Sequence, residues 1–172
     1  SGACDKLHGT TIPYLDGYSV LTWREPHGVT GHIIPWNYPL QIFGRSVGGA
    51  LAAGNSCVLK PAEDACLSLI RVAQLAAEVG FPAGAINIVT GYGHEVGDAL
   101  ARHLRNDHIS FTGSPTVGTI IQQVAAELQG PARQVLLQGD LNGRKGGGRG
   151  QRVPPEGGGV EDRPARRRGG GG

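Results

Sequence analysis

Short apolar segments alternate with helix-like segments along this chain from residue 28 onward. The expected strands cover residues 29–35, 56–60, 85–90, 108–112 and 135–137, and the expected helices cover residues 40–53, 65–79, 95–103 and 116–128. Strands joined by helices in this way form parallel sheets with right-handed crossovers, and strands that are apolar throughout are covered on both faces. The pattern therefore predicts an α/β fold with a doubly wound, Rossmann-like parallel sheet, which binds ligands at the carboxyl ends of its strands.

The segments on either side of this alternation have different compositions. Residues 10–25 are typical of a β-hairpin, because Asp16-Gly17 is a favoured hairpin turn and β-branched and aromatic residues flank it. A lone hairpin is marginally stable, so we expect it to pack on something else, such as another subunit. Residues 140–172 contain 12 of the 30 glycines and no aromatic residue, which predicts a disordered tail. Three parts are thus expected: a hairpin segment (1–25), a dinucleotide-binding domain (26–139) and the tail (140–172).

Charge and cysteine content argue against several classes of protein. Residues 1–139 carry 8 Lys and Arg against 10 Asp and Glu, while residues 140–172 carry 8 against 4. The excess of positive charge therefore lies in the tail. Because no aromatic residue accompanies the arginines of the tail, we expect no nucleic-acid partner. The chain has three cysteines without paired spacing, which disfavours a disulfide framework or a zinc site. So few cysteines, together with the lack of a secretory-type N-terminus, favour a cytoplasmic location. We expect no membrane span, because no apolar run is long enough to cross a bilayer. The sequence does not begin with Met, which suggests a fragment or a processed start.

The loop after the first expected strand is the most distinctive candidate for chemistry. Pro35 and Pro39 bracket it and restrict its backbone, so Trp36 and Asn37 are held in one non-regular shape. A rigid side-chain amide at a strand end can donate hydrogen bonds to a developing oxyanion. The alternative is a purely structural turn, and the residues alone leave both interpretations open.

Two further strand ends carry residues suited to a nucleotide. Lys60 and Glu63 follow the second expected strand, where a lysine can donate to ribose or phosphate and a carboxylate can accept from both ribose hydroxyls. Gly113-Ser114 follows the fourth strand at the start of a helix, where Gly113 would let a ligand approach the backbone and the helix dipole favours a phosphate. A solvated ion pair and simple helix capping by Ser114 are the alternatives. The run from Gly91 to Gly97 misses the G-x-G-x-x-G spacing, so we interpret it as a turn near the ligand.

Taken together, these motifs resemble the NAD(P)-dependent aldehyde dehydrogenase superfamily over roughly residues 8–130. The segments that carry the resemblance are Glu25-Pro26-x-Gly28-Val29, Pro35-Trp36-Asn37-Tyr38-Pro39, Ala53-Gly54-Asn55, Lys60-Pro61-Ala62-Glu63, Phe81-Pro82-Ala83-Gly84 with Asn87-Ile88-Val89-Thr90-Gly91, and Ile109-Ser110-Phe111-Thr112-Gly113-Ser114-x-x-Val117-Gly118. Their order and spacing match the family, although they cover only about a quarter of a typical member, so the resemblance implies an incomplete cofactor-binding domain.

The resemblance implies a role for each candidate residue. It makes Asn37 the oxyanion-stabilising amide, and it gives cofactor contacts to Ile33, Pro35, Trp36, Lys60, Glu63, Gly93, Ser114 and Val117. Lys60 and Glu63 would bind the adenosine ribose, Gly93 and Val117 would line the adenine slot, and Ser114 would contact the pyrophosphate. Because a carboxylate at position 63 would repel a 2′-phosphate, NAD is the expected cofactor, with NADP possible. Residues 8–25 are similar to the hairpin that joins subunits in the family, which implies a homo-oligomer.

The same resemblance implies oxidation of an aldehyde substrate to a carboxylic acid, with a cysteine nucleophile and a glutamate base. The family's Leu-Glu-Leu-Gly-Gly segment has no counterpart here, because the chain reads Gln134-Val135-Leu136-Leu137-Gln138-Gly139, and no Gly-Gln-x-Cys segment occurs. None of Cys4, Cys57 and Cys66 matches the nucleophile. We therefore expect this chain to be inactive alone; the alternative is a non-catalytic nucleotide-binding or subunit-interaction fragment.

Overall fold

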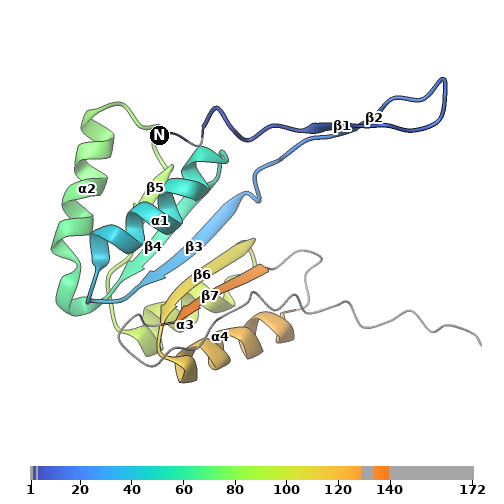
Figure 1. Cartoon of the computed structure of the whole chain (residues 1–172). Coiled ribbons are helices and arrows are strands. Elements are labelled where there is room, and N and C mark those ends of the chain that lie inside the picture. Colours follow the sequence, from blue (N-terminus) through green and yellow to red (C-terminus); the bar gives the residue numbers. More distant parts are fainter. Residues whose placement is uncertain (1, 3, 129–133, 140–172) are drawn as a thin grey trace, which may run out of the picture.

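The computed structural model of the chain describes residues 2, 4–128 and 134–139 and has an α/β architecture (Figure 1). Within these residues one sheet contains five parallel strands in the order β5-β4-β3-β6-β7. The strands are β3 (Val29–Ile34), β4 (Ser56–Pro61), β5 (Ile86–Ile88), β6 (His108–Gly113) and β7 (Gln134–Gly139). The chain builds outward from β3 on one side and then returns to its other side, so the winding direction reverses between β3 and β6. The predicted doubly wound parallel sheet is confirmed, including the short strand expected at 135–137.

Helices cover both faces of this sheet. They are α1 (Pro39–Ala52), η1 (Glu63–Ala65), α2 (Leu67–Glu78), η2 (Gly93–Gly97), α3 (Asp98–Arg102) and α4 (Pro115–Glu127). The connections from β3 to β4 and from β5 to β6 run in opposite directions across the sheet. Crossovers of one hand therefore place α1 and α2 on one face and α3 and α4 on the other, as Figure 1 shows.

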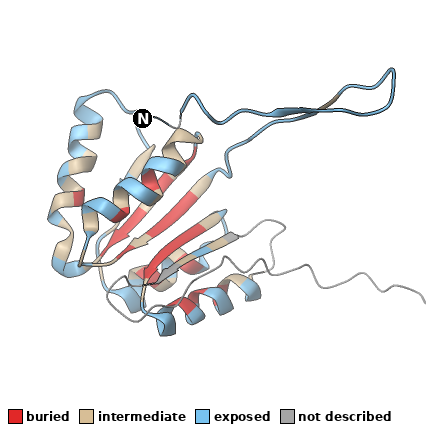
Figure 2. Cartoon of the chain, viewed as in Figure 1, coloured by how far each residue is buried: buried red, intermediate tan, exposed pale blue. Residues whose placement is uncertain are grey.

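Two apolar clusters form the core, one on each face of the sheet. The central strands carry most of the buried residues of the sheet (Figure 2). Ile34 and Leu59 pack with α1 and α2, and Ile33 and Phe111 pack with α4. Neighbouring residues of β3 thus serve opposite clusters, as the alternation of side chains along a strand requires. This explains why the strands are apolar at consecutive positions.

Two helix starts differ from the sequence prediction. The helix expected over 65–79 begins only at Leu67, because a hydrogen bond from the Ala65 amide to the Ala62 carbonyl (3.0 Å) closes a 3-10 turn first. Asp64 lies inside that turn and does not cap α2. The helix expected over 95–103 is divided into η2, a single π-helical turn, and the five-residue α3.

The N-terminal hairpin extends away from the sheet (Figure 1). Its strands β1 (Thr10–Ile12) and β2 (Val20–Thr22) pair in antiparallel register, with Thr10 opposite Thr22. Gly17 has a φ of 83°, so the predicted Asp16-Gly17 turn is confirmed. The tail over 140–172, which the sequence predicts to be disordered, lies outside the described residues. Within the described part of the chain, no helix is both long and apolar enough to cross a bilayer.

Candidate functional site

A pocket of about 580 Å³ opens at the carboxyl ends of β3, β4 and β6. It adjoins the point where the winding of the sheet reverses, which is where open α/β sheets bind ligands. Of the nine residues to which the family resemblance gives a role, eight line this pocket: Ile33, Pro35, Trp36, Asn37, Lys60, Gly93, Ser114 and Val117. The ninth, Glu63, is joined to the pocket by an ion pair with Lys60. The fold thus brings together residues from four separate segments of the chain.

The 35–39 loop forms one edge of the pocket. Pro39 begins α1, and the amide of Ile42 donates to the carbonyl of Tyr38 (3.0 Å), so the loop passes directly into that helix. At its other end the Ala62 amide donates to the Ile34 carbonyl (2.8 Å), which ties the end of β3 to the end of β4. Asn37 is therefore carried on a backbone that is fixed at both ends.

Lys60 places a buried positive charge in the pocket wall. Its side chain is 4% exposed and its Nζ atom lies 3.0 Å from Oε2 of Glu63, which is 46% exposed. The pKa of Glu63 lies below its usual value, because the carboxylate accepts from its own backbone N–H and from Lys60. Within the described residues Glu63 takes one of the three ammonium donors of Lys60. The remaining donors are available to a polar ligand in the pocket.

Ser114 caps α4 at the opposite wall. Its Oγ atom accepts from the amide of Val117 (3.4 Å), so the capping interpretation of Ser114 is correct for the side chain. Capping does not exclude ligand binding, because the hydroxyl can still donate its own hydrogen. Since the thirteen-residue α4 begins here, its positive dipole end also faces this part of the pocket.

Gly113 lines the pocket, and the expected approach of a ligand to its backbone stays a prediction. A Cβ atom at this position would lie 2.5 Å from the Phe111 ring, so packing against that ring also favours a glycine here. Gly93 is different, since a Cβ there would meet nothing within 4 Å.

Sequence reasoning missed the walls formed by α3 and the middle of α4. Asp98, Ile120 and Val124 all line the pocket. The α4 residues follow the spacing of a core-facing stripe, and no sequence signal separates a stripe that covers a core from one that lines a pocket. Asp98 lies in an ordinary helical segment and carries no motif.

Neither cysteine chemistry nor a metal centre is indicated in this pocket. Cys57 is buried in the core, where burial raises the pKa of its thiol, as expected for an inert residue. Cys4 and Cys66 are not among the residues that line the pocket. Among the described residues, no group of three or more His, Cys, Asp or Glu side chains could hold a metal ion.

The chain is similar to known aldehyde dehydrogenases in sequence and in structure. Hydroxyisobutyraldehyde dehydrogenase of Mycolicibacterium austroafricanum is 51% identical over 127 residues, which are 74% of this chain and 25% of that protein. A putative aldehyde dehydrogenase from Burkholderia cenocepacia has a TM-score of 0.75 and 72% identity, covering 79% of this chain and 28% of that one. The NAD+ complex of an aldehyde dehydrogenase from Bacillus cereus has a TM-score of 0.76 and 43% identity, over 80% of this chain and 28% of that one.

The chain therefore spans about a quarter of the length of the curated relatives that it matches. Residues 1–140 match the aldehyde dehydrogenase family. Because that match includes most of the chain and the solved relatives share its sheet, the chain belongs to the aldehyde dehydrogenase family.

Proposed function

We propose that this chain is the cofactor-binding segment of an NAD-dependent aldehyde dehydrogenase, an oxidoreductase that converts an aldehyde into a carboxylic acid. The observation that carries the proposal is the convergence of Asn37, Lys60 and Ser114 on one pocket at the reversal point of a doubly wound sheet. A solved relative with 43% identity over most of this segment binds NAD+.

The pocket fits a dinucleotide in both size and chemistry. Its volume of about 580 Å³ lies within the range of natural ligand sites. The adenosine ribose would be held by Lys60 and Glu63. The pyrophosphate would be bound by Ser114 and the start of α4, and the adenine would lie between Gly93 and Val117. Ile33, Pro35 and Trp36 would contact the nicotinamide end. Glu63 favours NAD over NADP, because its carboxylate would repel a 2′-phosphate, although NADP remains a possible cofactor.

When bound, NAD supplies the hydride acceptor for the oxidation. The contribution of this chain is to hold the dinucleotide and to present the Asn37 amide beside it. An amide on a backbone fixed at both ends needs little reorganisation to donate to an oxyanion that forms on the substrate carbon. The nucleophile and the base must come from residues that this sequence lacks, so we expect this chain to bind the cofactor without turnover.

The hairpin is proposed to join subunits of a homo-oligomer. It exposes large apolar side chains on both sides of its turn, among them Tyr14, Tyr18 and Trp23, which are 66%, 70% and 74% exposed. Aromatic side chains exposed together on a projecting element are typical of an interaction site. The cytoplasm remains the predicted location, and no nucleic-acid or membrane partner is proposed.

Isothermal titration of NAD into the full chain tests the proposal. We expect binding in the millimolar range, because only part of the family's cofactor site is included in the chain. Lys60→Met should weaken it about tenfold or more, since a charge-assisted hydrogen bond is lost from the pocket while the apolar stem is kept. Lys6→Met is the matched control, because among the described residues Lys6 pairs with its exposed neighbour Asp5 and does not line the pocket. No binding at millimolar NAD by a chain with intact circular dichroism would contradict the proposal.

A turnover assay tests the inactivity of the chain. Mixtures of NAD with aliphatic or aromatic aldehydes should give no NADH, measured by absorbance. Turnover that persists after all three cysteines are replaced by serine would show that this account of the missing nucleophile is wrong.

A further inference from the structure

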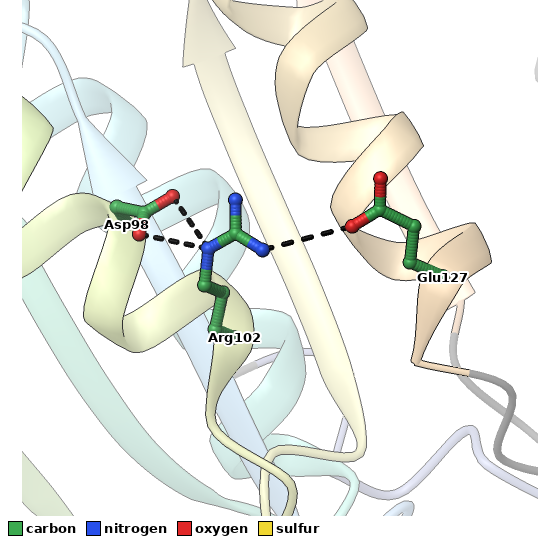
Figure 3. Close-up of polar contacts among 3 residues, drawn as sticks. All are labelled: Asp98, Arg102 and Glu127. Carbon is green, nitrogen blue, oxygen red and sulfur yellow. Dashed lines mark hydrogen bonds and ion pairs between the residues drawn. The ribbon is translucent and has the colours of Figure 1, made fainter.

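An ion-pair cluster links α3 and α4, two neighbouring helices that both line the pocket. Figure 3 shows Arg102 of α3 between Asp98 of the same helix and Glu127 of α4. The Nε atom of Arg102 lies 3.0 and 2.8 Å from the two oxygens of Asp98, and one of its terminal nitrogens lies 3.6 Å from Oε2 of Glu127. Asp98 itself lines the pocket.

The wall that this cluster holds is weak by itself. α3 has five residues, which is far below the length at which a helix is stable alone in water. It follows a π-helical turn that contains Gly93 and Gly97, and a Cβ atom at either glycine would meet nothing within 4 Å. The position of this wall therefore depends on its contacts with neighbouring elements.

The wall formed by α4 is a longer element. α4 has thirteen residues, and its buried Ile121 belongs to the core cluster on that face of the sheet. Among the described residues, the bond from Arg102 to Glu127 is the ion pair that joins α3 to α4. It therefore connects the short helix of the pocket wall to the long one.

We propose that Arg102 is a positioning residue that, together with Asp98 and Glu127, sets the width of the slot between α3 and α4. This inference rests on the proposed function, since the slot would hold the adenine end of the dinucleotide. The three residues lie on α3 and α4, the helices that flank this slot, whereas Asn37 lies in the loop between β3 and α1, so we expect the effect at the adenine end and not at the nicotinamide end. All three side chains are partly exposed, between 39% and 67%, and exposed ion pairs are weak, so the effect is expected to be modest.

Binding measurements on two ligands test the proposal. Arg102→Gln should weaken binding of NAD about three- to fivefold and leave binding of nicotinamide mononucleotide, which lacks the adenosine, unchanged. Arg102→Lys should recover part of the loss, and 1 M NaCl should remove the difference between the variants. Arg71→Gln is the matched control, because it breaks a similarly exposed ion pair with Glu78 inside α2.

Hydrogen exchange gives a second readout that needs no ligand. In Arg102→Gln, the amides over 93–103 should exchange about three- to fivefold faster than in the unaltered chain. The exchange of the α2 amides and the melting temperature of the whole chain should be the same as in Arg71→Gln. Equal NAD affinity and equal exchange in the two variants would overturn the proposal, as would an equal loss for both ligands. If the unaltered chain binds neither ligand, the proposed function fails; if it binds both and Arg102→Gln behaves as the control, only the positioning role fails.

Discussion

The β1–β2 hairpin and the five-stranded sheet both consist mainly of β-branched and apolar residues, but only the sheet buries them. All six strand residues of the hairpin are exposed or partly exposed, whereas four of the six residues of β3 are buried. In Figure 2 the hairpin is blue over almost its whole length and the central strands are red. Segments with similar strand propensities are therefore buried in one region of the molecule and exposed to solvent in the other.

The difference shows where the stabilising free energy comes from. The sheet is held by side chains that α1, α2 and α4 remove from water, such as Leu59 and Phe111. The hairpin is held by its turn and by local bonds, for example from the Thr10 amide to the Thr22 hydroxyl oxygen (3.0 Å). The two regions should accordingly respond in different ways to the same kind of change.

Truncating a buried leucine should separate the two regions most clearly. Leu59→Ala removes a side chain that is fully buried in the core, so we expect it to lower the free energy of unfolding by about 3 kcal/mol. Leu15→Ala in the hairpin loop, where the side chain is 64% exposed, should change it by less than about 0.5 kcal/mol. Urea unfolding followed by circular dichroism measures both. Similar losses would mean that the hairpin packs on the sheet.

Acid should weaken the sheet and leave the hairpin unaffected. His32 in β3 is 2% exposed, and burial, together with the nearby His108, lowers its pKa to about 4. Below the ordinary value of 6.5 the unfolded chain binds a proton that the folded chain does not, so stability falls with pH from about 6.5 towards 4. The expected loss between pH 7 and pH 5 is about 2 kcal/mol.

Burial and His27 also lower the pKa of His108, which adds to the same trend. The hairpin over 10–25 contains no histidine, so its cross-strand contacts should not change between pH 7 and pH 5. Urea titrations at pH 5, 6 and 7 measure the slope, and His32→Gln should reduce it. A slope that His32→Gln leaves unchanged would assign the pH dependence to other groups.

The contrast also shows what the sequence could predict. The alternation of apolar and helical segments was sufficient for the strands and for the faces of the sheet, and Asp16-Gly17 was sufficient for the hairpin, because these signals are local. Their positions at strand ends, together with the family resemblance, predicted Lys60 and Asn37 as site residues, and both line the pocket. The Arg102–Glu127 pair and the contact of Phe111 with Gly113 were not predictable, because they depend on distances that appear only after the helices pack on the sheet.

A single change in the hairpin turn should have the smallest and most local effect. Gly17 has a φ of 83°, and a Cβ there would meet nothing within 4 Å, so Gly17→Ala acts through backbone strain alone. We expect a cost of about 1 kcal/mol to hairpin closure, and therefore about fivefold faster hydrogen exchange at the Thr10 amide. Gly17→Asn should cost less, because asparagine tolerates this conformation, and the exchange of β3 amides should not change in either variant. A parallel increase in β3 would mean that the two regions unfold together, so that the hairpin contributes to the stability of the sheet despite its exposure.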